Sequence, residues 1–199
     1  MEALFSELRQ KLEEKPARTL QLPGVELRES AVLVPLFIRE GQPYALFTKR
    51  PANLRQHGGQ ISFPGGTRDP EDSTPLHTAL RETQEELGIP PAKIDILGML
   101  DEVPTSTQFR IVPFVGAIPP DFKYVASPEE IAEVIEVPLA HLLNPAAHRA
   151  ERRGVLEAAQ EVYFYDYGPN VIWGATARIL RNLLQHVQGL PTFIASLAR

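Results

Sequence analysis

Three glutamates, Glu82, Glu85 and Glu86, stand close together near the end of a helix that the sequence predicts over residues 75–87. At spacings of three and four residues their carboxylates are neighbours on the helix surface and repel one another. The negative end of the helix dipole disfavours these charges further. Mg²⁺ or Mn²⁺ prefers oxygen ligands and would relieve the repulsion. The cluster is therefore a candidate metal site, and the alternative is a solvated charged face.

The helix is bounded by residues with known capping preferences. Thr74 suits the N-cap, Pro75 the first helical position, and Gly88 followed by Pro90 the end. At about 100° per residue, the three glutamates fall opposite a face that can pack on a sheet. We expect the carboxylates to lie in a groove or in water. The packing face comprises Leu76, Leu80, Thr83 and Leu87.

Short apolar or alternating runs surround this helix. Residues 31–39 and 44–50 flank a Glu-Gly-Gln-Pro turn and predict a hairpin, and Pro35 predicts that the first strand is bulged or at an edge. The pattern indicates a layered α/β or α+β domain. Further strands are predicted over 60–63, 94–102, 109–118, 134–143 (ending in a helical turn) and 161–167, and further helices over 2–14 and 173–187.

Composition limits the class of protein. A chain of 199 residues, 43% of them hydrophobic, can form one domain, which we expect over 30–199 after a helix and linker over 1–29. The absence of cysteine excludes thiolate metal sites. A net charge of −5 argues against a broad nucleic-acid surface but allows a basic pocket for a small anion. With no signal-peptide pattern and no apolar run of about 20 residues, we expect a cytoplasmic protein that does not bind membranes.

The helix sequence resembles the Nudix box, whose core reads Arg-Glu-apolar-x-Glu-Glu-x-Gly-apolar. Residues 81–89 (RETQEELGI) match it at every fixed residue, with Thr83 in place of the usual aliphatic side chain. The interval from Gly66 to the box arginine is one residue longer than in the general box. Asp72 falls where the upstream glutamate of the box would be, and neither it nor Asp69 receives a role from the resemblance.

The longer interval is similar to that of the coenzyme A diphosphatase subfamily, which has a second signature just upstream. Residues 46–66 (LFTKRPANLRQHGGQISFPGG) resemble that signature, with departures at Phe47 and Pro51, and residues 171–177 also resemble the subfamily. The matching positions in the signature are Arg50, Arg55, Gly59 and the FPGG run over 63–66.

The resemblance implies an α/β/α sandwich in which the box helix packs on a mixed sheet. It implies a hydrolase dependent on Mg²⁺ or Mn²⁺ that cleaves the diphosphate of coenzyme A or a derivative to adenosine 3′,5′-bisphosphate and 4′-phosphopantetheine. The alternatives are a hydrolase of another nucleoside diphosphate derivative, such as ADP-ribose, and a non-catalytic nucleotide-binding domain. Relatives often pair, so a homodimer is also an expectation.

Within the box, the resemblance assigns Glu82 and Glu86 as the leading metal ligands, with Glu85 in the same cluster. Either Glu85 or Glu82 is the expected general base that activates water. Arg81 is expected to orient carboxylates, since guanidinium groups pair well with them. Gly88 is expected to have a structural role at the end of the helix.

Upstream of the box, Arg50 and Arg55 are candidates for binding substrate phosphates, because guanidinium forks suit phosphate oxygens. The alternative is that they form surface ion pairs or hold the loop in shape. Gly65 and Gly66 are expected to let the backbone approach the substrate closely. Trp173 and the aromatic run over 163–165 are expected in the core or at a subunit interface, because alternating aromatic residues in a strand usually pack.

Overall fold

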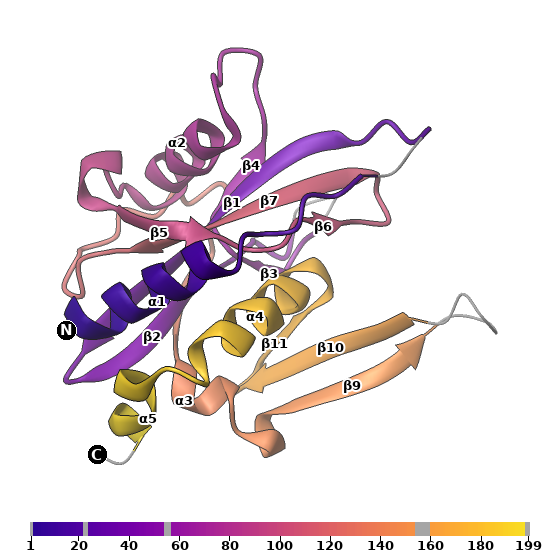
Figure 1. The fold of residues 1–199 in the computed structure, drawn as a ribbon. Coiled ribbons are helices and arrows are strands. Elements are labelled where there is room, and N and C mark those ends of the chain that lie inside the picture. Colours follow the sequence, from indigo (N-terminus) through magenta and orange to yellow (C-terminus); the bar gives the residue numbers. More distant parts are fainter. Residues whose placement is uncertain (1, 22–23, 54–56, 154–159, 198–199) are drawn as a thin grey trace.

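A mixed eight-stranded sheet forms the centre of the computed structural model, which describes residues 2–21, 24–53, 57–153 and 160–197 (Figure 1). Its main strand order is β3-β2-β1-β7-β5, with β4 pairing β1, β6 pairing β7 and β8 pairing β2. Only the β1–β7 pair is parallel. The strands are β1 Arg28–Arg39, β2 Gln42–Lys49, β3 Ile61–Ser62, β4 Gly65–Thr67, β5 Asp95–Met99, β6 Val103–Pro104, β7 Phe109–Ala117 and β8 Glu133–Pro138.

Helices cover both faces of this sheet, with α2 on one side and α1 and α4 on the other (Figure 1). A separate three-stranded antiparallel sheet, in the order β11-β10-β9, packs against α4. None of the helices in the described ranges is long and apolar enough to cross a membrane. The remaining elements are α1 Glu2–Glu14, α2 Pro75–Leu87, η1 Pro91–Lys93, α3 Leu139–Leu142, η2 Pro145–Ala147, β9 His148–Arg153, β10 Gln160–Tyr167, β11 Asn170–Trp173, α4 Gly174–Val187 and α5 Pro191–Leu197.

The predicted α/β layer architecture is confirmed, as are the first helix, the first hairpin and the box helix. The box helix spans Pro75–Leu87 because its ends are capped as predicted. The Thr74 side chain accepts a hydrogen bond from the backbone N–H of His77 at 3.1 Å. Gly88 has a φ of 71° and its N–H donates to the carbonyl of Gln84. The left-handed conformation favours glycine here.

The prediction that Pro35 marks an edge strand is wrong, because β1 lies inside the sheet. Over 36–39 the strand pairs with β2, and over 30–32 it pairs with β4. Pro35 falls between these two sets of pairs, so its missing N–H removes no bond from either ladder. The same change of partner places β4, which the glycine-rich sequence did not predict, beside the first half of β1. Strands β6, β9 and β11 and helix α5 were also not predicted.

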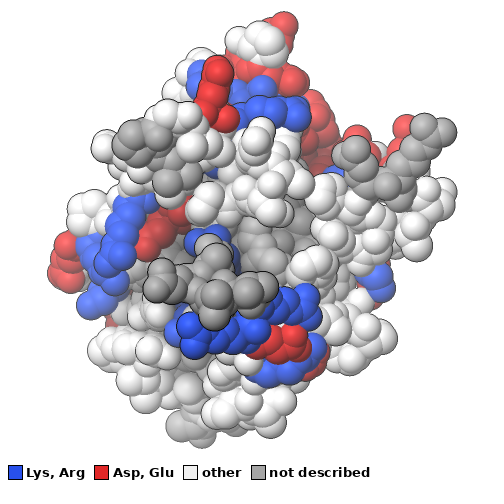
Figure 2. All heavy atoms as spheres, turned by 90° about the vertical axis from the view of Figure 1, so that its right-hand side faces the viewer, with Lys and Arg blue, Asp and Glu red and all other residues white. Residues whose placement is uncertain are grey.

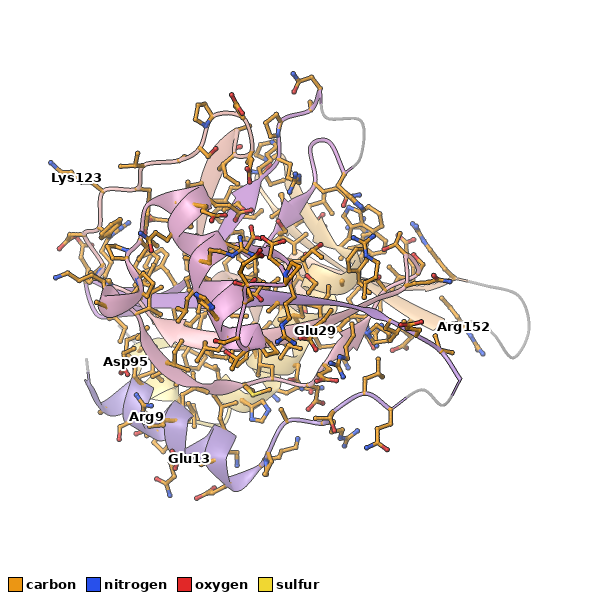
Figure 3. The ribbon with its side chains drawn as sticks, turned by 90° about the horizontal axis from the view of Figure 1, so that it is seen from above. Arg9, Glu13, Glu29, Asp95, Lys123 and Arg152 are labelled. Carbon is orange, nitrogen blue, oxygen red and sulfur yellow. The ribbon has the colours of Figure 1, made fainter. Side chains whose placement is uncertain are left out.

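Helix α1 belongs to the same core as the sheet. Leu4, Leu8 and Leu12 are all buried in the cluster that includes the apolar face of α4. Arg9 ties the helix to β5, donating to the Asp95 carboxylate at 2.8 Å and to the carbonyl of Ile96 at 2.6 Å. Figure 3 shows Arg9 and Asp95 side by side at this edge of the molecule. The helix predicted ahead of the domain therefore packs into the same hydrophobic core as the sheet.

Candidate active site

Glu86 lies in the interior, on the side of the box helix that packs on the sheet, so the prediction that it lies opposite the packing face is wrong. Its exposure is 3%. The helix packs on the sheet through Thr83, and Glu86 follows it on the same side of the helix, one turn later. The backbone N–H of Gly65 donates to Glu86 Oε2 at 3.3 Å. From the other side, Ser127 donates its N–H to the carbonyl of Glu86 at 3.0 Å.

The pKa of Glu86 is raised to about 8, chiefly by burial and to a smaller extent by the nearby carboxylates of Glu82 and Glu130. The Gly65 N–H and the charge of Arg50 act in the opposite direction. The pKa of Glu82 is also raised, mainly by burial, although Arg81 opposes the effect. Burial thus disfavours the charge of both neighbouring carboxylates, and the arginines only partly compensate for it. This donor set suits a hard divalent cation.

Arg81 organises the surface of the site. One of its terminal nitrogens, Nη2, lies 3.1 Å from Glu82 Oε1, and the other, Nη1, lies 3.0 Å from Glu85 Oε2. Its Nε and Nη2 also donate to the two oxygens of Asp72 at 3.1 and 2.9 Å. Asp69 is a further partner at 3.5 Å. A single guanidinium therefore fixes the positions of two of the three box glutamates.

Asp72, which had no assigned role, anchors this arginine. Its exposure is 2%, and it also accepts hydrogen bonds from Thr78 Oγ1 at 2.9 Å and from the N–H of Asp69 at 3.0 Å. The bonds from Arg81 hold the pKa of Asp72 well below its usual range. The signal that could have revealed this role was its place in the sequence, where the general box has a glutamate.

Glu85 does not join the other two glutamates. Its side chain is 56% exposed and is held outward by Arg81. Among the described residues, no three acidic or histidine side chains are close enough to hold a metal ion together. Glu82 and Glu86 are therefore the pair that the fold brings together, and the metal site itself stays a prediction.

Close contacts leave no room for a side chain at Gly65 or Gly66. A Cβ on Gly66 would lie 2.4 Å from Glu82 Oε1. Gly65 has a φ of 147°, and a Cβ there would lie 2.3 Å from the carbonyl oxygen of Ala31. Both distances are below van der Waals contact. The glycines thus let β4 lie directly against the carboxylates of α2.

Arg50 is the upstream arginine that the structure places near this site. Its Nε is buried and, within the described residues, has no hydrogen-bond partner. Its charge is close enough to lower the pKa of Glu86. A buried hydrogen-bond donor without a partner raises the free energy of the folded protein, so this N–H is suited to donate to an anionic oxygen of a ligand. Arg55 lies outside the described residues.

Residues 27–159 match the sequence model of the NUDIX domain, which covers well over half of the chain. This chain belongs to the Nudix hydrolase family. It is 41% identical over 164 residues to the uncharacterized Nudix hydrolase NudL of Photorhabdus laumondii, a match that covers 81% of this chain and 86% of NudL. A NudL of Cronobacter sakazakii is 42% identical over 167 residues, covering 82% of this chain and 85% of the relative.

The fold of this Nudix hydrolase is similar to that of a solved MutT/nudix family protein from Enterococcus faecalis. The TM-score is 0.55 at 17% identity, with 90% of this chain and 71% of the other chain covered. At this identity the likeness establishes the fold only. The family match and the NudL relatives, not this likeness, identify the chain as a hydrolase of a diphosphate compound, an acid anhydride.

Proposed function

We propose that this Nudix hydrolase cleaves the diphosphate of coenzyme A or a coenzyme A derivative, giving adenosine 3′,5′-bisphosphate and 4′-phosphopantetheine. The observation that carries the proposal concerns Arg50, the upstream signature residue: its buried Nε has no hydrogen-bond partner among the described residues, and its charge lowers the pKa of Glu86. The upstream signature and the longer interval before the box, both similar to the coenzyme A diphosphatase subfamily, point to the same substrate.

Glu82 and Glu86 would hold the cation, since they are the box carboxylates that interact with each other and whose charge is disfavoured by burial. When bound, Mg²⁺ or Mn²⁺ would neutralise charge on the diphosphate oxygens and would make water a better nucleophile. The chain adds Arg50, whose unpartnered Nε can donate to a diphosphate oxygen. The closely packed β4 backbone holds the glutamates in place.

The proton of the attacking water goes to a carboxylate oxygen of Glu85 or Glu82. Glu85 is exposed and held by Arg81, so it is oriented without being buried. Glu82 is more buried and has a raised pKa, which suits a base that works near neutral pH. We expect Glu82→Gln and Glu86→Gln each to lower turnover strongly, and unchanged rates would contradict the assignment of these residues.

The substrate is tested by incubating the protein with coenzyme A and either Mg²⁺ or Mn²⁺ and identifying the products by mass spectrometry. We expect adenosine 3′,5′-bisphosphate and 4′-phosphopantetheine in equal amounts. ADP-ribose and dephospho-coenzyme A serve as parallel substrates. Faster cleavage of ADP-ribose would move the assignment to another nucleoside diphosphate derivative, and no turnover of any substrate with either metal would favour a binding domain.

A further inference from the structure

A pocket of about 480 Å³ opens where the two sheets approach one another. Its walls include Ser62 of β3, Thr105 after β6 and Thr176 in the first turn of α4. Figure 2 shows the side of the molecule on which β7 begins, with a hollow near the centre of the face and, below it, Lys and Arg side chains interspersed with acidic ones. Gly65, the donor to Glu86, follows Ser62 by three residues, a span of at most about 10 Å.

Trp173 lies at this pocket and is 44% exposed, so the expectation that it packs in the core is wrong, and its alternative, a subunit interface, stays a prediction. Along β11, Asn170 and Ile172 point inward and the alternate residues point outward. Phe164, the partner of Trp173 on β10, is buried, with two arginine guanidinium groups over its ring. The indole of Trp173 is therefore the aromatic surface that stays open at the pocket. Such a surface can stack on a nucleobase.

The charged residues that line the pocket are two arginines, Arg153 and Arg178, and one acid, Glu161. Arg153 is paired with Glu151 at 2.7 Å, which leaves Arg178 as the cation available to a ligand. Helix α4 begins here without a side-chain cap, which leaves its first N–H groups free for an anion. Arg178 donates to the carbonyl of Pro104 at 3.3 Å and has no ion pair among the described residues. These donors fit a phosphate group.

We propose that this pocket holds the nucleoside half of the substrate. The base stacks on Trp173, and the phosphate on the ribose lies between Arg178 and the first turn of α4. The inference rests on the proposed function, because the diphosphate must lie at Glu82 and Glu86 for the nucleoside to reach the pocket. Ser62 at the pocket and Gly65 at Glu86 are only three residues apart, so one extended substrate molecule can reach from the pocket to the glutamates.

Trp173 is the only tryptophan in the chain, so its fluorescence reports on the pocket without any turnover. In a buffer with chelator, adenosine 3′,5′-bisphosphate should quench the emission and bind about tenfold more tightly than AMP, because only the former has the 3′-phosphate. Arg178→Gln should remove this difference. The matched control is Arg181→Gln, whose parent side chain lies on the same helix but packs over the Tyr163 ring at 4.2 Å, outside the pocket.

Calorimetry tests the stacking contact directly. Trp173→Phe should keep the affinity for the bisphosphate within a few fold, whereas Trp173→Ala should lower it about tenfold. Circular dichroism confirms that each variant is folded. No quenching by the bisphosphate, or equal binding of bisphosphate and AMP, would overturn the inference, as would stronger quenching by 4′-phosphopantetheine.

The same samples separate this inference from the proposed function. Quenching by the bisphosphate without any cleavage of coenzyme A would refute the proposed function and support the pocket. Cleavage of coenzyme A without quenching would support the proposed function and place the nucleoside elsewhere.

Discussion

Replacing Glu86 by glutamine should make the metal-free protein more stable at high pH while it lowers activity. The side chain keeps its shape, and its amide oxygen can still accept the Gly65 N–H. Glutamine removes the charge that burial disfavours. The stability of this protein and the chemistry of its site therefore make opposite demands on residue 86.

The size of the effect follows from the pKa of Glu86, which rises from 4.5 to about 8 on folding. The folded state binds a proton more tightly than the unfolded state, so the wild type loses stability as the pH rises from 4.5 through 8. At 1.36 kcal/mol per pKa unit, the full penalty above pH 8 is about 5 kcal/mol. Entry of water into the site lowers this figure, and we expect a gain of about 2–4 kcal/mol for Glu86→Gln at pH 9.

The assay is urea unfolding in the presence of a chelator at pH 5 and at pH 9, followed by circular dichroism. At pH 5 the gain should be about 1 kcal/mol or less, because Glu86 is then mostly protonated in the folded protein. Glu85→Gln is the matched control and should show no such gain, since Glu85 is exposed. Added Mg²⁺ should stabilise the wild type more than Glu86→Gln. A variant that is no more stable than the wild type at pH 9 would refute the reasoning.

Three further predictions concern the residues around this pair. Asp72→Asn should destabilise the protein by about 3–5 kcal/mol at pH 7, because it leaves Arg81 without its buried partner. Since folding lowers the pKa of Asp72, the stabilisation by its ion pair is present at neutral pH. The difference in urea midpoint between the wild type and Asp72→Asn should therefore narrow as the pH falls below 3.8. A difference that stays constant with pH would contradict a stabilising ion pair. Gly66→Ala should lower kcat about 10²-fold with a small change in Tm, because the new Cβ displaces the flexible end of Glu82; wild-type kcat would show that this contact is unimportant. Glu85→Gln should lower kcat about 10²-fold or more at unchanged Tm if Glu85 is the base, and an unchanged kcat would assign that role to Glu82.

The sequence predicted the elements whose signals are local. The box helix begins and ends where Thr74 and Gly88 require, because capping depends on a few neighbouring residues. The first hairpin likewise follows from two apolar runs and a short turn. The spacing of Glu82, Glu85 and Glu86 was enough to indicate the chemistry, since it is fixed by the helical repeat.

Tertiary structure decided what surrounds these residues. Helical periodicity placed Glu86 opposite the packing face, but its side chain is buried and accepts a hydrogen bond from Gly65 of β4, and no local pattern records the approach of that strand. The pairing of Arg81 with Asp72 joins residues on a loop and a helix, so it depends on the path of the loop. Trp173 is exposed because its partner strand directs it to the pocket. Sequence spacing thus fixed which groups can react, and packing between distant segments fixed their charge, burial and access to substrate.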